Sequence, residues 1–380
     1  MIFKLFLYYN KFAMKKFRLS LCVFLSLFVF VFAVGCSGEK PRTSEFICFN
    51  SLVTVCVYDK PLSDEFVNEI KTTFTALEKE FSTTDGTFTS VFNAAEKNVP
   101  VPLSSHGRAV YDAAKAVYEF TDGKFNPAVY PLIDLWGFTP DKYKRPGLTF
   151  TPPAEEQITA VLDGGITDFN KIKLTDDKTA AFKTDGAVKI DLGGILKGYA
   201  ADLAGEILAE YGYASGYVSA GSSSIRLINV DKLLVRHPEA FVSQTAPNAL
   251  LSINCKDKTV SVSTSGVYER YNEYDGLKYP HVIDPATGRP TNGKVTSATV
   301  TGVDGATADA LTTALCLCDF TETDYAETEL AALIKKIAEK YPGAGIYAAA
   351  KCESGKYVIT NEKENSDFTL KDGAYKVFTV

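Results

Sequence analysis

The sequence is poor in features that mark several large classes of protein. It has only three histidines, and its cysteines form no pair of Cys-x-x-C motifs, which argues against a zinc site. No long basic run follows residue 36 and the net charge is -6, so nucleic acid is not an expected partner. There is no internal repeat and no low-complexity segment. With 380 residues, 46% apolar and 23% charged, the composition is that of an ordinary globular protein.

The amino terminus differs from the rest of the chain. Lys15, Lys16 and Arg18 precede the apolar run LSLCVFLSLFVFVFAVG (19–35), and Cys36 follows it. A basic segment and a short apolar segment indicate an export signal. AVGC resembles a bacterial lipobox, so we expect a signal peptide at 1–35, a lipidated Cys36 with a polar tether at 36–45, and one domain at 46–380. A simple cleaved signal or an uncleaved anchor are the alternatives, and all three export the domain.

Hydrophobic periodicity predicts an α+β fold, because strands cluster in the sequence and do not alternate regularly with helices. We expect the remaining six cysteines to be mostly buried, and leave a disulfide among them open. The predicted helices are 62–80, a short one within 81–95, 107–123, one from Ile195, 305–319 and 328–340. The predicted strands are 46–59, 187–190, 216–221, 223–229, 232–237, 249–255, 258–266, 296–304 and short strands at the end. Residues 139–153 read as a surface loop.

The stretch IDLGGILKGYAAD (190–202) places Asp191, Gly193, Gly194 and Lys197 at a predicted strand-to-helix turn. Free N–H groups at a helix start attract anions, and a lysine one turn later adds a full charge. The spacing fits neither G-x-G-x-x-G nor G-x-x-x-x-G-K-(S/T), so a plain structural turn is an equal alternative. The segment STSGVYERY (263–271), containing Ser265, is likewise either a site or an ordinary turn.

His281 lies in YPHVIDPATGRPTN (279–292), close to Asp284 and Gly288. A histidine titrates near neutral pH and can move a proton, so it is a candidate general base, with Asp284 as a second candidate. In the alternative, Asp284 only orders a turn, Gly288 supplies a positive φ and His281 packs.

The helix ATADALTTAL (306–315) carries a carboxylate and two hydroxyls on one face. Asp309 and Thr313 are four residues apart, with Thr312 beside them. These hard oxygen donors suit Mg²⁺, which needs only one or two carboxylates in addition to phosphates and water. In the alternative, Asp309 caps the helix and the threonines bond back to its carbonyls.

Together these segments resemble the ApbE family, the FAD:protein FMN transferases, over about residues 46–345. The landmarks are FSTTDGTFTSVFN (81–93), FNPAVYPLIDLWGF (125–138), IDLGGILKGYAAD, STSGVYERY, HVIDPATGRP (281–290) and ADALTTAL (308–315). The resemblance implies a mixed sheet with packed helices, related to the T-fold. It also implies FAD as substrate, Mg²⁺ as cofactor, and transfer of FMN to a threonine hydroxyl of an acceptor protein with release of AMP.

The resemblance also assigns roles to individual residues. The metal ligands it implies are Gly194, Asp309, Thr312 and Thr313, with Gly194 acting through its carbonyl. Its FAD contacts are Phe49, Thr84, Phe125, Asn126, Pro127, Asp191, Lys197, Ser265 and Ile283. The turn at 220–224, AGSSS, departs from the Gly-Gly-Asp or Gly-Gly-Asn that the family commonly has there.

Partners and alternative activities follow from the same resemblance. The acceptors it implies are extracytoplasmic proteins with a D-x-x-(S/T)-(G/A)-(A/S)-T-like motif. Mg²⁺-dependent hydrolysis of FAD to FMN and AMP would use the same residues with water as nucleophile. A non-catalytic flavin-binding lipoprotein is the third hypothesis.

Overall fold

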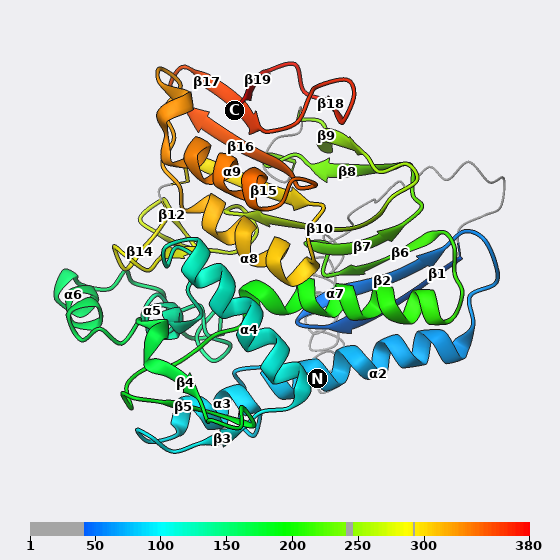
Figure 1. Ribbon diagram of the computed structural model, residues 1–380. Helices are drawn as coiled ribbons and strands as arrows, with labels where there is room; N and C mark the ends of the chain where they lie inside the picture. The colour runs from blue at the N-terminus through cyan, green and yellow to red at the C-terminus, as the bar shows by residue number, and fades with distance from the viewer. Residues whose placement is uncertain (1–41, 241–245, 292) are drawn as a thin grey trace, which may run out of the picture. The chain divides into compact units, whose positions relative to one another are not determined.

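The centre of the computed structural model is a nine-stranded sheet, and the residues described are 42–240, 246–291 and 293–380 (Figure 1). Its strand order is β1-β2-β6-β7-β10-β15-β16-β17-β19. Neighbours pair antiparallel except β17 and β19, which are parallel, so the sheet is mixed as expected. The strands are β1 Arg42–Cys48, β2 Ser51–Val57, β6 Gly216–Ala220, β7 Ser224–Ile228, β10 Thr259–Gly266, β15 Val295–Thr301, β16 Gly345–Cys352, β17 Gly355–Thr360 and β19 Tyr375–Thr379.

Four smaller sheets flank the large one. β18-β9-β8 and β3-β5-β4 have three strands each, and β11-β12 and β13-β14 are two-stranded hairpins. Their bounds are β3 Val101–Pro102, β4 Ile172–Leu174, β5 Ala180–Lys183, β8 Lys232–Arg236, β9 Ala249–Asn254, β11 Tyr271–Tyr274, β12 Leu277–Pro280, β13 Ile283–Asp284, β14 Arg289–Pro290 and β18 Phe368–Leu370.

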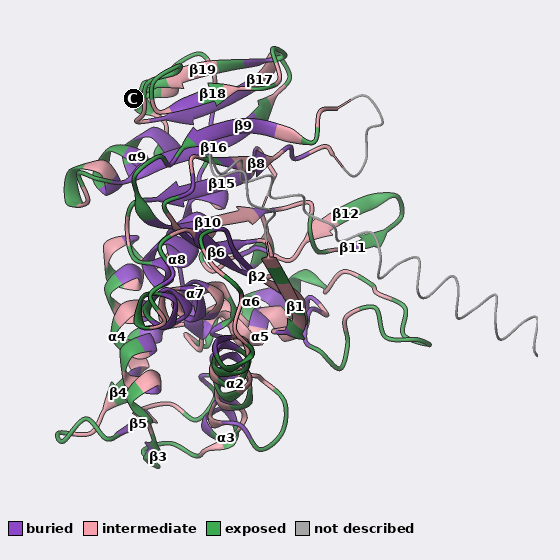
Figure 2. Ribbon diagram, turned by 90° about the vertical axis from the view of Figure 1, so that its right-hand side faces the viewer, coloured by how far each residue is buried: buried purple, intermediate pink, exposed green. Residues whose placement is uncertain are grey.

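Two helices, α7 and α8, lie against one face of the large sheet and are buried along most of their length (Figures 1 and 2). Both are rich in glycine and alanine, which allows close contact with each other and with the strands. The α-helices are α2 Asp64–Phe81, α3 Phe88–Ala94, α4 Ser105–Phe120, α5 Tyr130–Leu135, α6 Glu155–Asp163, α7 Gly193–Glu210, α8 Gly305–Cys316 and α9 Glu329–Lys340. Short 3-10 turns occupy Pro127–Val129, Phe169–Lys171 and Tyr325–Glu327.

The expected strand 46–59 is wrong, because the segment is a hairpin of β1 and β2. Phe49 and Asn50 form its turn with φ values of 54° and 53°. Two successive positive φ values mark the type I′ turn that joins twisted antiparallel strands. The turn is held by the Phe49 N–H, which donates to Glu78 Oε1 at 2.7 Å.

The expected strand 187–190 is also wrong, although the segment does lead to a helix start. The side chain of Asn93 takes the place of a neighbouring strand: its Nδ2 donates to Ile190 O at 2.9 Å, and its Oδ1 accepts from Ile190 N at 2.7 Å. A buried backbone needs such partners. The main chain before Asp191 is therefore fixed by a side chain of α3.

Most other elements are confirmed within two or three residues, and residues 139–153 form a loop. The six cysteines of the described part are free thiols, and all but Cys352 are buried. The predicted signal at 1–35 and the lipidation of Cys36 lie outside the described residues. Among the residues searched, no helix combines the length and apolar character needed to cross a membrane.

Candidate functional site

The site lies where the start of α7 meets α8 and the end of β10. Lys197 precedes Gly198, whose N–H donates to Asp309. Burial raises the pKa of Asp191 and Asp309, and the charge of Lys197 opposes that rise; the same charge adds to the lowering of the pKa of His281 by burial. Arg270, which follows β10, lowers the pKa of Asp191 and His281 as well. Candidates from three separate segments of the sequence therefore share one electrostatic environment.

Asp309 is a buried carboxylate on α8, with 3% of its surface exposed. The alternative that it caps the helix is wrong, because Asp304 is the N-cap and accepts from Thr307 N at 2.8 Å. Instead Asp309 Oδ2 accepts from Gly198 N of α7 at 3.1 Å. Burial raises its pKa, while Lys197 and hydrogen bonds from Gly198 and Ser224 oppose that shift. A buried carboxylate of this kind is suited to holding a cation.

The other proposed metal ligands, Gly194, Thr312 and Thr313, differ in how available their oxygens are. Thr313 Oγ1 lies 3.5 Å from where a Cβ of Gly194 would be, so the two residues are neighbours. Thr312 Oγ1 is fully buried, donates to Asp309 O at 2.7 Å and contacts Ser265 Oγ at 2.9 Å. Both threonine hydroxyls bond back to the helix as the alternative expected, Thr313 more weakly at 3.4 Å.

This donor set fits a magnesium ion. No group of three His, Cys, Asp or Glu side chains comes together in the described ranges, so a site here depends on one carboxylate with hydroxyl and carbonyl oxygens. Mg²⁺ accepts such a set when phosphates and water complete its shell. Asp309, Thr313 and the carbonyl of Gly194 are the residues placed to hold it, while the hydrogen bonds of Thr312 leave it less available.

The start of α7 is only partly open to an anion. Asp191 Oδ1 accepts from Gly193 N at 2.7 Å, and the N–H groups of the next residues, Ile195 and Leu196, bond to Leu192 O. The expected phosphate site at this helix start therefore has fewer free N–H groups than predicted, and the side chains of Arg270 and Lys197 supply its positive charge. Burial raises the pKa of Asp191, opposed by the hydrogen bond from Gly193 and by the charges of Arg270 and Lys197.

The FNPA turn contacts the start of α7 directly. Pro127 O accepts from Asp191 N at 2.9 Å, and the ring of Phe125 lies 3.3 Å from where a Cβ of Gly194 would be. Asn126 Oδ1 caps the following 3-10 turn at Ala128 N, and its Nδ2 donates to Thr167 O. All three residues are buried, and two of them pack directly against the start of α7.

His281 is held as a single tautomer. Its Nδ1 lies 3.1 Å from Arg270 O, and a carbonyl can only accept, so Nδ1 carries the proton and Nε2 keeps a lone pair. Burial, Arg270 and Lys197 lower the pKa of His281 to about 3. The imidazole is therefore neutral at neutral pH and able to accept a proton at Nε2.

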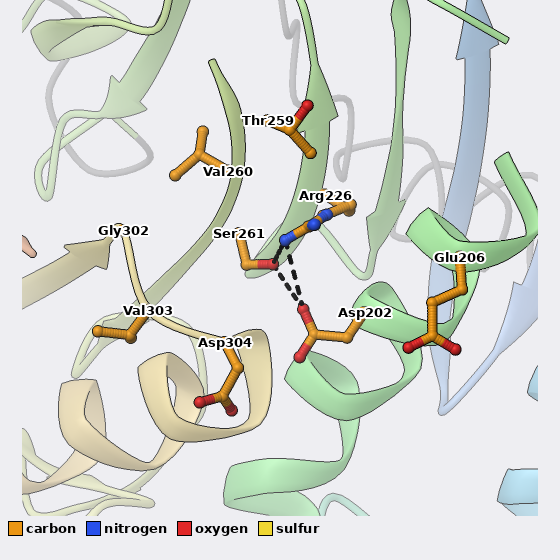
Figure 3. Close-up of a pocket in the computed structure, with 9 residues that line it drawn as sticks. All are labelled: Asp202, Glu206, Arg226, Thr259, Val260, Ser261, Gly302, Val303 and Asp304. Carbon is orange, nitrogen blue, oxygen red and sulfur yellow. Dashed lines mark hydrogen bonds and ion pairs between the residues drawn. The ribbon is translucent and has the colours of Figure 1, made fainter. Parts of the chain in front are cut away.

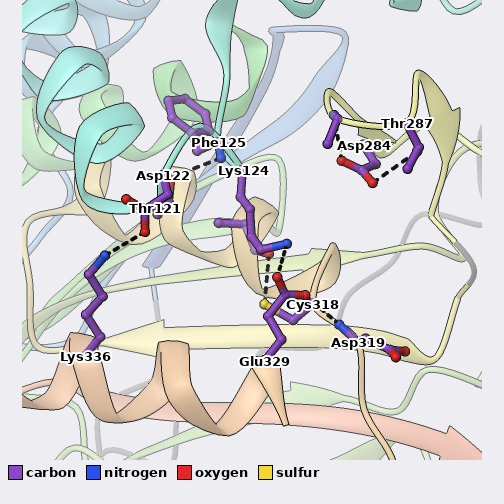
Figure 4. Close-up of polar contacts among 12 residues, drawn as sticks. Thr121, Asp122, Lys124, Phe125, Asp284, Thr287, Cys318, Asp319, Glu329 and Lys336 are labelled. Atoms are coloured by element: carbon purple, nitrogen blue, oxygen red, sulfur yellow. Dashed lines mark hydrogen bonds and ion pairs between the residues drawn. The ribbon is translucent and has the colours of Figure 1, made fainter.

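Asp284 is engaged in its own loop, which Figure 4 shows beside Thr287. Its Oδ1 accepts from Ala286 N at 2.9 Å and its Oδ2 from Thr287 Oγ1 at 3.0 Å. Gly288 has a φ of 67°, as the turn alternative expected. The geometry favours loop ordering over proton transfer for Asp284, and leaves His281 as the candidate base.

The remaining FAD candidates are not joined to this group by the contacts observed. Phe49 packs against Phe74 of α2, with ring centroids 5.6 Å apart. Thr84 is exposed and bonds within its own turn, to Ser82 Oγ. Ile283 is buried in a separate apolar cluster with Trp136.

Two residues of the site were not singled out as candidates from the sequence. Arg270 accepts at its carbonyl from both His281 N and Nδ1, and its guanidinium donates to Phe138 O at 3.2 Å. Ser224, in the turn that departs from the family pattern, donates to Asp309. The available signal was the turn at 220–224 itself; the structure places Gly221 of this turn beside the Lys197 side chain.

A buried carboxylate, a lysine and a helix start that lie together define a site for a metal-bound anionic substrate. The chain belongs to the ApbE family, whose model matches residues 49–334. This match covers most of the chain and includes every site residue discussed above.

Several characterised proteins are similar to this chain. The FAD:protein FMN transferase of Treponema pallidum is 27% identical over 297 residues, covering 71% of this chain and 79% of that protein. The enzyme of the same name from Salmonella typhimurium is 31% identical over 206 residues, which span 52% of this chain and about half, 55%, of that protein. The solved structure of the ApbE protein of Thermotoga maritima matches with a TM-score of 0.68 and 28% identity, covering 82% of this chain and 94% of that one. Flavin transferase ApbE of Vibrio cholerae also matches with a TM-score of 0.68, at 25% identity over 84% and 97% of the chains.

Proposed function

We propose that this protein is a flavin transferase, which moves the FMN half of FAD onto a threonine hydroxyl of an acceptor protein and releases AMP. The observation that carries the proposal is the meeting of α7 with α8: Asp309 accepts from Gly198 N, the residue after Lys197, and Asp191 accepts from Gly193 N at the start of the same helix. The charge of Lys197 also acts on His281. That arrangement combines a cation-binding carboxylate, a positive charge for a diphosphate and a proton acceptor. The family membership and the named relatives support it.

Mg²⁺ is the metal that we propose for Asp309, Thr313 and the Gly194 carbonyl. When bound, the ion supplies positive charge that neutralises a diphosphate and makes its phosphorus easier to attack. Lys197 adds a second positive charge from the first turns of α7, at an orientation fixed by the helix. Preorganised charges of this kind stabilise the negative charge of the transition state.

His281 is the base in this proposal. The threonine hydroxyl gives its proton to Nε2 as its oxygen forms a bond to the FMN-side phosphorus, and the bond from that phosphorus to the bridging oxygen of AMP breaks. The low pKa of free His281 reflects the charges of Arg270 and Lys197 in addition to burial. A bound diphosphate offsets those charges, so it raises the pKa of His281 toward the range in which a general base works best.

We also propose that the chain is anchored outside a bacterial membrane by a lipid on Cys36. AVGC after a basic and apolar segment is the support for this placement. The acceptors would then be extracytoplasmic proteins with a D-x-x-(S/T)-(G/A)-(A/S)-T-like motif. Mass spectrometry of the purified membrane-bound protein would identify the lipid, and an unmodified Cys36 would refute the anchor.

The proposed reaction is tested with purified protein, FAD, Mg²⁺ and an acceptor domain that carries the motif. We expect the acceptor to gain the mass of FMN while AMP appears in equal amount, and a Thr→Val acceptor to remain unmodified. AMP released at the same rate without acceptor would indicate an FAD pyrophosphatase. Tight FAD binding with no AMP in either case would indicate a flavin-binding lipoprotein.

A further inference from the structure

The backbones of α7 and α8 touch at a pair of glycines. A Cβ on Gly198 would lie 1.9 Å from Gly305 O, and a Cβ on Gly305 would lie 2.4 Å from Gly198 O. Real Cβ atoms do not approach other atoms so closely, so both positions depend on glycine. This contact fixes how near the two helices can come.

At this contact, one aspartate of each helix accepts hydrogen bonds from the backbone of the other helix. Asp202, four residues after Gly198, accepts from Gly305 N at 2.6 Å and from Ala306 N at 3.3 Å through Oδ2. Asp309, four residues after Gly305, accepts from Gly198 N at 3.1 Å. The two carboxylates form a reciprocal pair, and one of them is the proposed metal ligand.

Asp202 is also tied to the sheet, as Figure 3 shows. Its Oδ1 accepts from Ser261 Oγ of β10 at 2.6 Å and lies 3.9 Å from Arg226 Nη1 of β7. Arg226 Nη1 donates to the same serine at 2.8 Å. These groups line a cavity of about 470 Å³ together with Glu206, an exposed carboxylate one turn further along α7.

We propose that Asp202 is a positioning residue for Asp309, a role that rests on the proposed function of Asp309 as metal ligand. Asp202 fixes the start of α8 against α7 and the sheet, and so sets where the carboxylate of Asp309 stands one turn later. Its own hydrogen bonds go to the backbone of α8 and to Ser261. Partners that orient a metal ligand affect metal affinity about 10–100-fold when removed.

The first test measures metal binding without turnover. Mn²⁺ is titrated into purified protein saturated with FAD, with no acceptor present, and free Mn²⁺ is followed by electron paramagnetic resonance against a titration of FAD alone. We expect Asp202→Ala to weaken Mn²⁺ binding by at least about tenfold. Glu206→Ala is the matched control, because that carboxylate lines the same cavity from the same helix, and we expect it to bind Mn²⁺ as the wild type does.

The second test measures transfer at varied Mg²⁺ and FAD. We expect Asp202→Ala to raise the half-saturating Mg²⁺ concentration and to leave the KM for FAD unchanged at saturating Mg²⁺. Asp202→Asn should fall between this variant and wild type, because its amide oxygen can still accept from Gly305 N. If Asp202→Ala does not fold, Asp202→Asn and Ser261→Ala provide the same comparison, with shifts in the same direction.

The outcomes separate this inference from the proposed function. A folded Asp202 variant with wild-type Mn²⁺ affinity would overturn the positioning role, and so would a lower kcat with unchanged Mg²⁺ dependence, which is the mark of a purely structural residue. Wild-type protein that binds no Mn²⁺ and transfers flavin without Mg²⁺ would instead overturn the metal assignment itself.

Discussion

Replacing Gly198 by alanine tests the contact between α7 and α8 on which the site depends. Ordinary contact begins near 3.4 Å, and the new Cβ would lie 1.9 Å from Gly305 O, so about 1.5 Å of separation is missing. Both atoms belong to buried backbone or are attached to it directly, so no flexible side chain can move aside. The helices themselves must separate or tilt.

The energetic cost follows from that displacement. A shift of this size would break the 3.1 Å hydrogen bond from Gly198 N to Asp309. Overpacking a core costs about 1–3 kcal/mol, and a hydrogen bond to a charged group about 1.5–3 kcal/mol. Alanine regains about 1 kcal/mol in helix propensity. We therefore expect Gly198→Ala to lower the free energy of unfolding by about 1.5–5 kcal/mol and to weaken Mg²⁺-dependent transfer.

Urea unfolding and the transfer assay measure both effects, with Gly107→Ala as control. Gly107 is also a buried helical glycine, but the atom nearest its new Cβ is a terminal methyl of Leu103 at 2.8 Å, which can rotate away. The control should change stability much less and leave transfer intact. If Gly198→Ala unfolded at the same urea concentration as the control and kept wild-type transfer, the contact between Gly198 and Gly305 would not be what holds α7 and α8 in place.

Three further predictions concern charge and hydrogen bonding at the site. Asp309→Asn should abolish Mg²⁺-dependent transfer without lowering the melting temperature at neutral pH. Burial raises the pKa of Asp309, so its charged form opposes folding at any pH above the pKa of the unfolded state. A clearly lower melting temperature would contradict this. In the flavin-free protein the imidazole of His281 should show no NMR titration near its ordinary pKa of 6.5, since its pKa in the folded state is about 3. Because the folded pKa is the lower one, the free energy of unfolding should fall as the pH drops from 6.5 toward 3. A chemical-shift midpoint near 6.5 would refute the assignment. Asn93→Ala should cost about 1–3 kcal/mol in urea unfolding, because it leaves both buried backbone groups of Ile190 without their partners, whereas an unchanged midpoint would show that other groups replace the amide.

Sequence patterns predicted the helices well, because the buried face of an amphipathic helix shows as apolar residues three and four positions apart within the helix itself. Phe66, Ile70, Phe74 and Leu77 of α2 were recognisable by spacing alone, and all four are buried. Strands were less certain where partners are distant in the sequence. The segment 187–190 has the alternation of a strand, yet its backbone bonds to Asn93, which lies 97 residues from Ile190.

The two alternatives for Asp309 could not be separated from the sequence either, because the choice depends on a residue of another helix. Its sequence neighbourhood allows both helix capping and metal binding, since an aspartate early in a helix can do either. Asp304 takes the cap, and this frees Asp309 to reach Gly198 of the other helix. The threonine pattern was ambiguous for a related reason: Thr312 bonds back to the helix, and its contact with Ser265 joins segments 47 residues apart.

The sequence by itself determined the α+β class, the helices, the membership of a family and the residue types available for chemistry, because these depend on local periodicity and on order along the chain. Only the tertiary structure decided which of those residues meet. Lys197, Asp309 and His281 come from three segments. Asp309 accepts from Gly198, the residue after Lys197, because α7 and α8 pack glycine against glycine, and the charge of Lys197 also reaches His281. Electrostatic and hydrogen-bonding effects act over a few ångströms, and separation along the chain does not reveal such distances.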